Sequence, residues 1–359
     1  MRRESQAALV EGNAHRAAGR AAAAVEAYRR SLAIDPQFAS AHYNLGLALR
    51  DAGERRASVL AFREAARLDP GDFDAMRNVV ATLARTIEAG EGTLFESKAS
   101  PAQGDCGASA LSIVVCSVDD RRLAAMQRNY SAALGALEHQ FVVIRDARSL
   151  AEGYSRGLEQ SHHELVVFSH DDVELVSPRP FGHIVRALER YNLVGLAGSR
   201  RVSGPAVMWA GHPHVHAWVS YPANPPAAGW DAGLFSLEGG LLAGMQALDG
   251  LFFAARREVV RKVGFDAPTF DGFHFYDLDF TYRAHLAGFK LAITTDVLAI
   301  HESPGRFDDD WKRYAERFQA KFPALSAPAG DYHAYGARFA SKQQLVRFFA
   351  ELRALGEVA

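Results

Sequence analysis

A histidine and two carboxylates follow an apolar run in the middle of the chain. Residues 165–168 are predicted to form a buried strand, which leads through Ser169 into His170, Asp171 and Asp172. Unpaired carboxylates are costly to bury, so two of them at a strand end need a cation or a set of hydrogen-bond donors. In open α/β sheets, ligands bind at the carboxyl ends of the strands. The segment therefore predicts a site for a metal ion and a phosphate-bearing ligand.

The sequence around this segment predicts the sheet that would position it. Beyond the first hundred residues, short apolar runs alternate with helical stretches, which is typical of a parallel, doubly wound α/β sheet. Polar residues also end the two preceding strands, with Ser117 and Asp119 at the first and Asp146 at the second. Because the carboxyl ends of parallel strands lie on one sheet edge, we expect these groups to converge on the same ligand.

Composition and motifs disfavour several common partners and cofactors. No Gly-x-Gly-x-x-Gly follows the first strand and no Gly-Lys-Ser/Thr loop is present, so dinucleotide and P-loop chemistry are disfavoured. A net charge of −2 gives no reason to expect nucleic acid or an anionic membrane as the main partner. The most apolar window, 239–255, is too short and too polar to be a transmembrane segment. Without a secretory h-region after the first residues, we expect a cytoplasmic protein.

The first part of the chain carries an internal repeat with a period of 34 residues. Pro36 and Pro70 stand at this spacing, each at the end of a similar helical phrase that closes with Asp-Pro. The period and the phrases resemble the tetratricopeptide repeat (TPR) family, which implies an all-α module over residues 1–90. Asn44 and Asn78 keep the same offset. In the family this position faces a concave groove and can hold an extended peptide; the alternative is an ordinary amide on the helix surface.

Short segments in the second part of the chain occur in an order that is typical of one enzyme family. They cover residues 112–117, 151–158, 168–173, 247–254, 273–280 and 288–291. This ordered set resembles the GT-A-fold glycosyltransferases of family 2, which implies a Rossmann-like, mostly parallel sheet over residues 111–305. The chain departs from the family at His170, which replaces the first aspartate of the family's aspartate-x-aspartate motif. It departs again at Tyr276, where the family often has a glutamate.

The resemblance implies roles for most polar residues at the predicted sheet edge. Asp172 and His301 are expected to bind a divalent cation, Mn²⁺ or Mg²⁺, and Asp277 to act as the catalytic base. The residues expected to bind the nucleotide-sugar donor are Ser117, Asp119, Asp146, Arg156, Asp171, Asp249 and Gly250, and those expected to bind the acceptor are Tyr276 and Asp279. Simpler alternatives stay open, because carboxylates can cap helices or lie in solvated turns, and His301 can be structural.

Three alternating histidines lie in an irregular segment rich in Pro and Gly, 202–240. On a strand, His212, His214 and His216 would share one face. They could form a second metal site, although a polar loop on the acceptor side is the favoured interpretation.

The predicted organisation has four regions. Residues 1–90 form the TPR-like module, 91–110 a linker rich in Gly, Ser and Ala, and 111–305 the GT-A domain. Residues 306–359 form a helical extension that is expected to pack on the catalytic domain.

The implied reaction moves a sugar from a nucleotide-diphosphate donor, with a UDP-sugar favoured, to a hydroxyl of a protein or glycan acceptor. One visible base and no separate nucleophile favour inversion, and the repeats would recruit the protein acceptor or another protein partner. The first alternative is a non-catalytic TPR scaffold fused to a degenerate nucleotide-sugar-binding domain. The second is a nucleotidyltransferase, which would normally carry a glycine-rich loop after the first strand.

Overall fold

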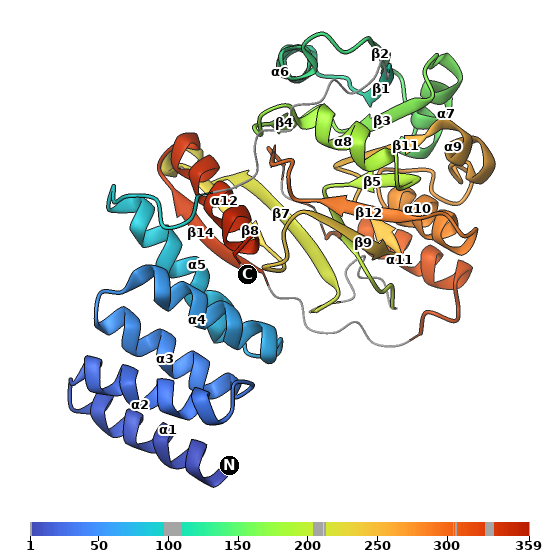
Figure 1. Ribbon diagram of the computed structural model, residues 1–359. Helices are drawn as coiled ribbons and strands as arrows, with labels where there is room; N and C mark the ends of the chain where they lie inside the picture. Colours follow the sequence, from blue (N-terminus) through green and yellow to red (C-terminus); the bar gives the residue numbers. More distant parts are fainter. Residues whose placement is uncertain are drawn as a thin grey trace. The chain divides into compact units, whose positions relative to one another are not determined.

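The chain forms two compact units (Figure 1). The computed structural model describes residues 2–96, 110–203, 211, 213–303, 305, 307–326 and 334–358. The helical unit comprises Met1–Lys98 with Tyr335–Ala359, and the sheet unit comprises Ala99–Ala334. Most of the predicted linker, 91–110, lies outside the described residues. Helical repeats therefore precede a mixed α/β domain, which confirms the predicted fold class.

The helical unit is built from helices that pair in sequence order. Helix α1 (Arg2–Ala17) packs on α2 (Ala21–Ile34), and α3 (Ala39–Asp51) packs on α4 (Arg55–Leu68), which is followed by α5 (Phe73–Glu88). These close approaches depend on two glycines that stand 34 residues apart. A Cβ added to Gly12 would lie 2.5 Å from the Tyr28 ring, and one added to Gly46 would lie 2.7 Å from the Phe62 ring. The 34-residue repeat in the sequence therefore corresponds to a repeated glycine–aromatic contact between neighbouring helices.

The segment after residue 305 is divided between the two units. Strand β14 (Tyr335–Phe339) and helix α12 (Lys342–Gly356) pack against α5 in the helical unit. Helix α11 (Asp309–Lys321) belongs to the sheet unit, where Phe318 packs on Phe275 with 5.6 Å between the ring centroids. The predicted extension over 306–359 therefore consists of two parts, with α11 in the sheet unit and β14 and α12 in the helical unit.

The larger sheet of the sheet unit has the strand order β2-β1-β3-β11-β5-β12-β9. Its strands are β1 (Leu111–Cys116), β2 (His139–Ile144), β3 (Leu165–Ser169), β5 (Leu193–Gly195), β9 (Leu241–Met245), β11 (Phe252–Arg256) and β12 (Leu291–Thr294). Strands β2, β1, β3, β5 and β12 run in one direction, whereas β11 and β9 run in the opposite one. The sheet is therefore mixed, with a parallel majority.

Helices cover this sheet, and its central strands are buried on both faces (Figure 1). The helices of the unit besides α11 are α6 (Asp120–Leu134), α7 (Leu150–Gln160), α8 (Pro180–Leu188), α9 (Arg257–Val263) and α10 (Tyr276–Leu286), with a short 3₁₀ turn, η1 (Pro226–Ala228). Along β1, Val114 enters one core cluster while Ile113 and Val115 enter the other. This two-sided burial explains why the strand reads as a continuous apolar run.

A smaller sheet lies beyond the carboxyl end of β3. Its strand order is β10-β6-β7-β13-β4, and β8 pairs with β7. The strands are β4 (Val173–Leu175), β6 (Ala197–Ser199), β7 (Val215–Pro222), β8 (Trp230–Leu234), β10 (Ala247–Leu248) and β13 (Ala299–His301). The chain crosses from the larger sheet to the smaller one between β3 and β4. Residues 170–172 therefore lie in the turn that joins the two sheets.

Among the described helices, none combines the length and the apolar character that a bilayer span requires.

Candidate active site

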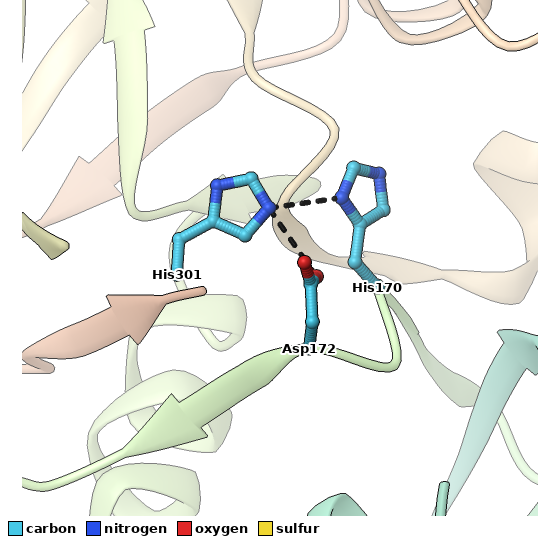
Figure 2. Close-up of side chains that lie close together, drawn as sticks. All are labelled: His170, Asp172 and His301. Atoms are coloured by element: carbon cyan, nitrogen blue, oxygen red, sulfur yellow. Dashed lines mark hydrogen bonds and ion pairs between the residues drawn. The ribbon is translucent and has the colours of Figure 1, made fainter. Parts of the chain in front are cut away.

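His170, Asp172 and His301 converge at the junction of the two sheets (Figure 2). His170 follows β3, Asp172 immediately precedes β4, and His301 ends β13. Antiparallel pairing of β4 with β13 sets Val173 opposite His301, which brings the preceding aspartate beside the histidine. Nε2 of His301 lies 3.3 Å from Oδ1 of Asp172 and 3.4 Å from Nδ1 of His170.

Backbone hydrogen bonds hold the turn that carries these side chains. The His170 N–H donates to the Leu251 carbonyl over 3.0 Å, which ties the turn to the residue before β11. The Glu302 N–H donates to the Asp172 carbonyl, also over 3.0 Å, which extends the ladder between β4 and β13. The positions of the three side chains are therefore set by sheet hydrogen bonds and not by a free loop.

Electrostatics keep Asp172 ionised and His170 neutral. Burial alone would raise the pKa of Asp172, but hydrogen bonds from His301 and from the Ser303 hydroxyl bring it below the ordinary value. Burial, and then the neighbouring His301, lower the pKa of His170 to about 4. A neutral imidazole keeps one nitrogen lone pair for a ligand.

The three side chains have the chemistry of a metal site. One ligand atom from each lies within 4.8 Å of those from the other two. Ligand atoms bound to one first-row metal ion at about 2.0–2.2 Å lie roughly 3 to 3.5 Å apart. The distances of 3.3 and 3.4 Å from Nε2 of His301 to the other two ligand atoms agree with this range. Two imidazole nitrogens and one carboxylate oxygen form a donor set that suits a divalent ion. Among the described residues, this is the group of His, Cys, Asp and Glu side chains with such spacing.

Asp277 lies in the first turn of α10 with its carboxylate almost fully buried. The preceding Phe275 has a left-handed backbone with φ of 62°, which turns the chain sharply into the helix. Only 4% of Asp277 is exposed, and Oδ2 accepts a hydrogen bond from the Gly250 N–H over 2.7 Å. Burial raises the pKa of Asp277 to about 7, and the charge of Asp249 adds to this effect. Asp277 can therefore exchange a proton near neutral pH.

Asp249 and Gly250 support this carboxylate from a neighbouring turn. Oδ1 of Asp249 accepts a hydrogen bond from the Leu251 N–H over 2.8 Å, and burial raises the pKa of Asp249. A Cβ added to Gly250 would overlap the Tyr276 hydroxyl and lie 3.0 Å from the Asp277 Cβ. Only glycine lets the backbone approach this closely.

The carboxyl end of β1 contributes a second polar group. The Ser117 hydroxyl donates to Oδ2 of Asp171 over 2.6 Å, so the ends of β1 and β3 meet as expected for adjacent parallel strands. Burial raises the pKa of Asp171. The serine and this carboxylate therefore form a partly exposed polar edge beside the metal-ligand cluster.

Comparison with known proteins assigns the family. Residues 112–322 match the model of a family described as "Glycosyltransferase like family", which is more than half of the chain. The chain belongs to this glycosyltransferase-like family. Residues 12–53 and 39–72 match models described as "TPR repeat" and "Tetratricopeptide repeat", which confirms the repeats. No curated protein matches the chain at a significant level.

One similar solved structure is a mutant of the Thermobaculum terrenum O-GlcNAc transferase. It is 20% identical, with 39% of this chain and 30% of that chain covered and a TM-score of 0.22. The matched part thus spans less than a third of that structure's length, and a likeness this weak carries no weight for fold or activity.

In this glycosyltransferase-like domain, other predicted donor-binding residues lie at exposed positions. Asp119 caps α6, because Oδ1 accepts hydrogen bonds from the Arg121 and Arg122 N–H groups. Asp146 pairs with Arg156 across 2.9 Å on the surface. Asp119 therefore has a clear structural role, whereas the Asp146–Arg156 pair stays available to a ligand.

The two residues predicted to bind the acceptor are buried in structural contacts. Asp279 has no exposed surface, and its oxygens pair with Arg283 at 2.7 Å and Lys321 at 2.6 Å. Tyr276 is 3% exposed, and its hydroxyl contacts Nε2 of His170 at 2.9 Å and the Gly250 carbonyl at 3.2 Å. Both side chains are thus engaged in contacts within the fold, and the binding of acceptor by either residue stays a prediction.

The alternative of a second metal site at His212, His214 and His216 is not supported by the described residues. His216 is buried in β7, and Nδ1 lies 3.0 Å from the Ser236 hydroxyl. His214 precedes that strand, and His212 lies outside the described residues.

The two asparagines of the TPR module differ in their contacts. Asn44 lines a cavity of about 460 Å³ together with Asn13, Arg16, Tyr28 and Asp51. Asn78 is engaged within the module, because Oδ1 accepts a hydrogen bond from Arg50 over 2.6 Å. Asn44 therefore lies at the cavity, whereas the side-chain oxygen of Asn78 is already hydrogen-bonded to Arg50.

Sequence reasoning missed one contributor to the site, gave a second a different role and left the role of a third in doubt. Ser303 donates a hydrogen bond to Asp172, and Tyr276 contacts His170. His170 joins the cluster, although its replacement of an aspartate had put its ligand role in doubt. The signal was present in the sequence: both departures from the family pattern, His170 and Tyr276, are polar residues that are able to hydrogen-bond to each other.

Proposed function

We propose that the chain is a metal-dependent glycosyltransferase of the GT-A type, which moves a sugar from a nucleotide-diphosphate donor to an acceptor hydroxyl. The observation that carries the proposal is that Gly250 and Tyr276 link the Asp277 carboxylate to the metal-ligand cluster. Gly250 hydrogen-bonds to the Asp277 carboxylate through its N–H and to the Tyr276 hydroxyl through its carbonyl, and Tyr276 contacts His170 of the metal-ligand cluster. A base and a cation site are thus fixed to one another.

Asp277 is the residue that would take the proton of the acceptor hydroxyl. A base is most effective when its pKa lies near the working pH, and burial has raised the pKa of this carboxyl to about 7. Asp249 hydrogen-bonds to the Leu251 N–H and raises the pKa of its neighbour, which supports a role in tuning the base. With one base and no further carboxylate assigned as a nucleophile, single displacement with inversion is the proposed course.

Asp172 and His301 would hold the divalent ion, and the Ser117–Asp171 edge would contact the nucleotide. When bound, such an ion neutralises charge on the leaving diphosphate. Asp146 and Arg156 are proposed to contact the base or ribose, because Asp146 follows β2, the strand beside β1, and pairs with Arg156 of α7. A UDP-sugar is the first donor to test.

The TPR module is proposed to recruit a protein acceptor or a protein partner. The cavity lined by Asn44, Arg16 and Asp51 supports this role, since it offers both charge signs and an amide to a peptide backbone. The cytoplasmic location stays a prediction from the sequence.

The proposal is tested by incubating the purified chain with UDP-, GDP- and dTDP-sugars, with Mn²⁺ or Mg²⁺, and quantifying the released nucleoside diphosphate. We expect release from at least one donor, and its loss in Asp277→Asn. The non-catalytic scaffold predicts instead that a nucleotide binds without release from any donor, with or without a candidate acceptor.

A further inference from the structure

His170 and Tyr276, where the chain departs from the family-2 pattern that its sequence resembles, contact each other. Nε2 of His170 lies 2.9 Å from the Tyr276 hydroxyl, although the residues are 106 positions apart. Tyr276 is buried among aromatic rings, with its centroid 5.5 Å from that of Tyr154. Each of the two residues therefore supplies a hydrogen-bonding partner for the other.

The hydrogen-bond partners of the Tyr276 hydroxyl favour one tautomer of His170. A tyrosine hydroxyl has one proton to donate, and the Gly250 carbonyl, 3.2 Å away, can only accept. When the hydroxyl donates to this carbonyl, its oxygen accepts from His170, so Nε2 of the imidazole carries the hydrogen. Nδ1 then holds the lone pair, and this is the atom that faces His301 at 3.4 Å. The opposite tautomer would take the hydroxyl proton away from the Gly250 carbonyl.

We propose that His170 is a third metal ligand through Nδ1, which makes a centre of two histidines and one carboxylate that prefers a transition-metal ion to Mg²⁺. Tyr276 is the positioning residue that holds His170 in the ligating tautomer. This inference deepens the proposed function, since the ion is the one that would serve sugar transfer.

The donor atoms give the physical basis of the preference. Mg²⁺ favours oxygen ligands and retains its waters, whereas imidazole nitrogen binds Zn²⁺, Co²⁺ and, more weakly, Mn²⁺. An aspartate at position 170 would have supplied a second carboxylate, and the histidine removes that negative charge and adds a nitrogen. A histidine in place of an aspartate therefore weakens the binding of Mg²⁺ more than the binding of Mn²⁺, Co²⁺ or Zn²⁺.

Three features of the structure agree with a third nitrogen ligand. The His170 nitrogen points to the same place as Nε2 of His301 and Oδ1 of Asp172 (Figure 2). The Ser303 hydroxyl engages the other oxygen of Asp172, which leaves Oδ1 for the ion. Tyr276 supplies the outer hydrogen bond that metal-binding histidines usually make.

Metal binding is measured on the untagged full chain, because a histidine tag would bind the same ions. Titration calorimetry is run with Mn²⁺, Zn²⁺ and Mg²⁺ alone, without nucleotide. We expect Mn²⁺ to bind at least tenfold tighter than Mg²⁺, and Zn²⁺ tighter still. The spin-echo spectrum of bound Mn²⁺ should show ¹⁴N coupling from two imidazoles. Equal affinities for Mn²⁺ and Mg²⁺, or a spectrum without imidazole nitrogen, would overturn the proposal.

Substitution of His170 tests its role as a ligand. His170→Asp should raise the affinity for Mg²⁺ and reduce the Mn²⁺ preference below threefold, and the spectrum of bound Mn²⁺ should lose one imidazole. An unchanged preference and an unchanged spectrum would show that His170 is not a ligand. The wild-type spectrum decides the question even where the variant does not fold.

Tyr276→Phe tests the positioning role, because it removes the hydroxyl and keeps the ring. We expect the affinity for Mn²⁺ to fall about 10- to 100-fold while far-UV circular dichroism is unchanged. The ¹⁵N chemical shifts of His170 in the metal-free chain should change from the Nε2–H tautomer toward a mixture. Tyr28→Phe is the matched control, since Tyr28 is a buried tyrosine of the helical unit whose hydroxyl donates to Asn13. Unchanged affinity and tautomer in Tyr276→Phe would refute the positioning role.

These outcomes separate the inference from the proposed function. Selective binding of Mn²⁺ without sugar transfer from any donor leaves the metal centre intact and removes the proposed function. Sugar transfer that Mg²⁺ supports as well as Mn²⁺, with equal affinities for the two ions, upholds the function and refutes the inference.

Discussion

The Gly250 N–H donates a hydrogen bond to the Asp277 carboxylate, with 2.7 Å between the nitrogen and Oδ2. This bond connects the turn before β11 to the first turn of α10, and the carbonyl of the same glycine accepts a hydrogen bond from the Tyr276 hydroxyl. The proposed base is thus oriented by a backbone N–H, which at position 250 only a proline would remove.

Replacement of Asp277 by asparagine should abolish the ascending limb of the pH–rate profile. A carboxylic acid cannot accept a proton, so kcat/KM of the wild type should rise with pH and level off above about 7. In Asp277→Asn we expect kcat to fall by about 10²- to 10⁴-fold. The measurement is steady-state kinetics between pH 5.5 and 9 in saturating Mn²⁺. A wild-type rate that is flat over this range would argue against Asp277 as the base.

The same substitution should stabilise the metal-free chain at high pH. An aspartate titrates near 3.9 in the unfolded chain and at about 7 here, so the folded state binds the proton more tightly. Stability is therefore lost as pH rises from about 4 to about 7, and Asp277→Asn escapes this loss. We expect the variant to gain on the order of 2 kcal/mol over the wild type at pH 8, and much less at pH 4.5, in urea unfolding with chelator. A gain that did not grow with pH would contradict the raised pKa.

Gly250→Ala should damage the site without unfolding the chain. The added Cβ overlaps the Tyr276 hydroxyl and presses on Asp277, so both the base and the support of His170 are displaced. We expect turnover to fall at least about 100-fold, since small misplacements of reacting groups have effects of this size. Gly92→Ala is the control, because a Cβ there meets nothing within 4 Å. Equal turnover in the two variants would show that the close approach at Gly250 is unimportant.

Asp279→Ala should affect stability and not the binding of acceptor. Its removal takes one carboxylate from Arg283 and Lys321, but Lys321 keeps Asp266 and Arg283 keeps the Val263 and Gly264 carbonyls. We therefore expect a loss smaller than the about 3–5 kcal/mol of an uncompensated buried charge. The milder Asp279→Asn keeps the shape of the side chain and allows kinetics to be measured. We expect its KM for acceptor to equal that of the wild type, with a lowered Tm. An acceptor KM raised tenfold at full stability would return Asp279 to the acceptor site.

Local patterns in the sequence were sufficient to predict helical repeats followed by an α/β domain. Gly12 packs against Tyr28, and 34 residues later Gly46 packs against Phe62 in the same way. The repeat is visible in the sequence because each copy uses the same packing arrangement. The apolar runs that became β1 and β3 are buried on both faces, so they stand out as strands without any tertiary information.

The site was harder to predict because its contacts join distant parts of the chain. The partner of His170 is 106 residues away, and β4 reaches His301 only through a change of sheet after β3. The burial of Asp279 depends on Lys321 from α11. One local argument was available: residues two apart on a helix point about 200° apart, so Asp277 and Asp279 could not both face one ligand.

The most direct test of the proposed function is nucleoside diphosphate release from a panel of nucleotide sugars with Mn²⁺, measured side by side for the wild type and Asp277→Asn. A glycosyltransferase with this base predicts release from at least one donor by the wild type and a rate lower by about 10²- to 10⁴-fold in the variant. Release at the same rate by both proteins, or no release from any donor in the presence of candidate acceptors, would contradict the account.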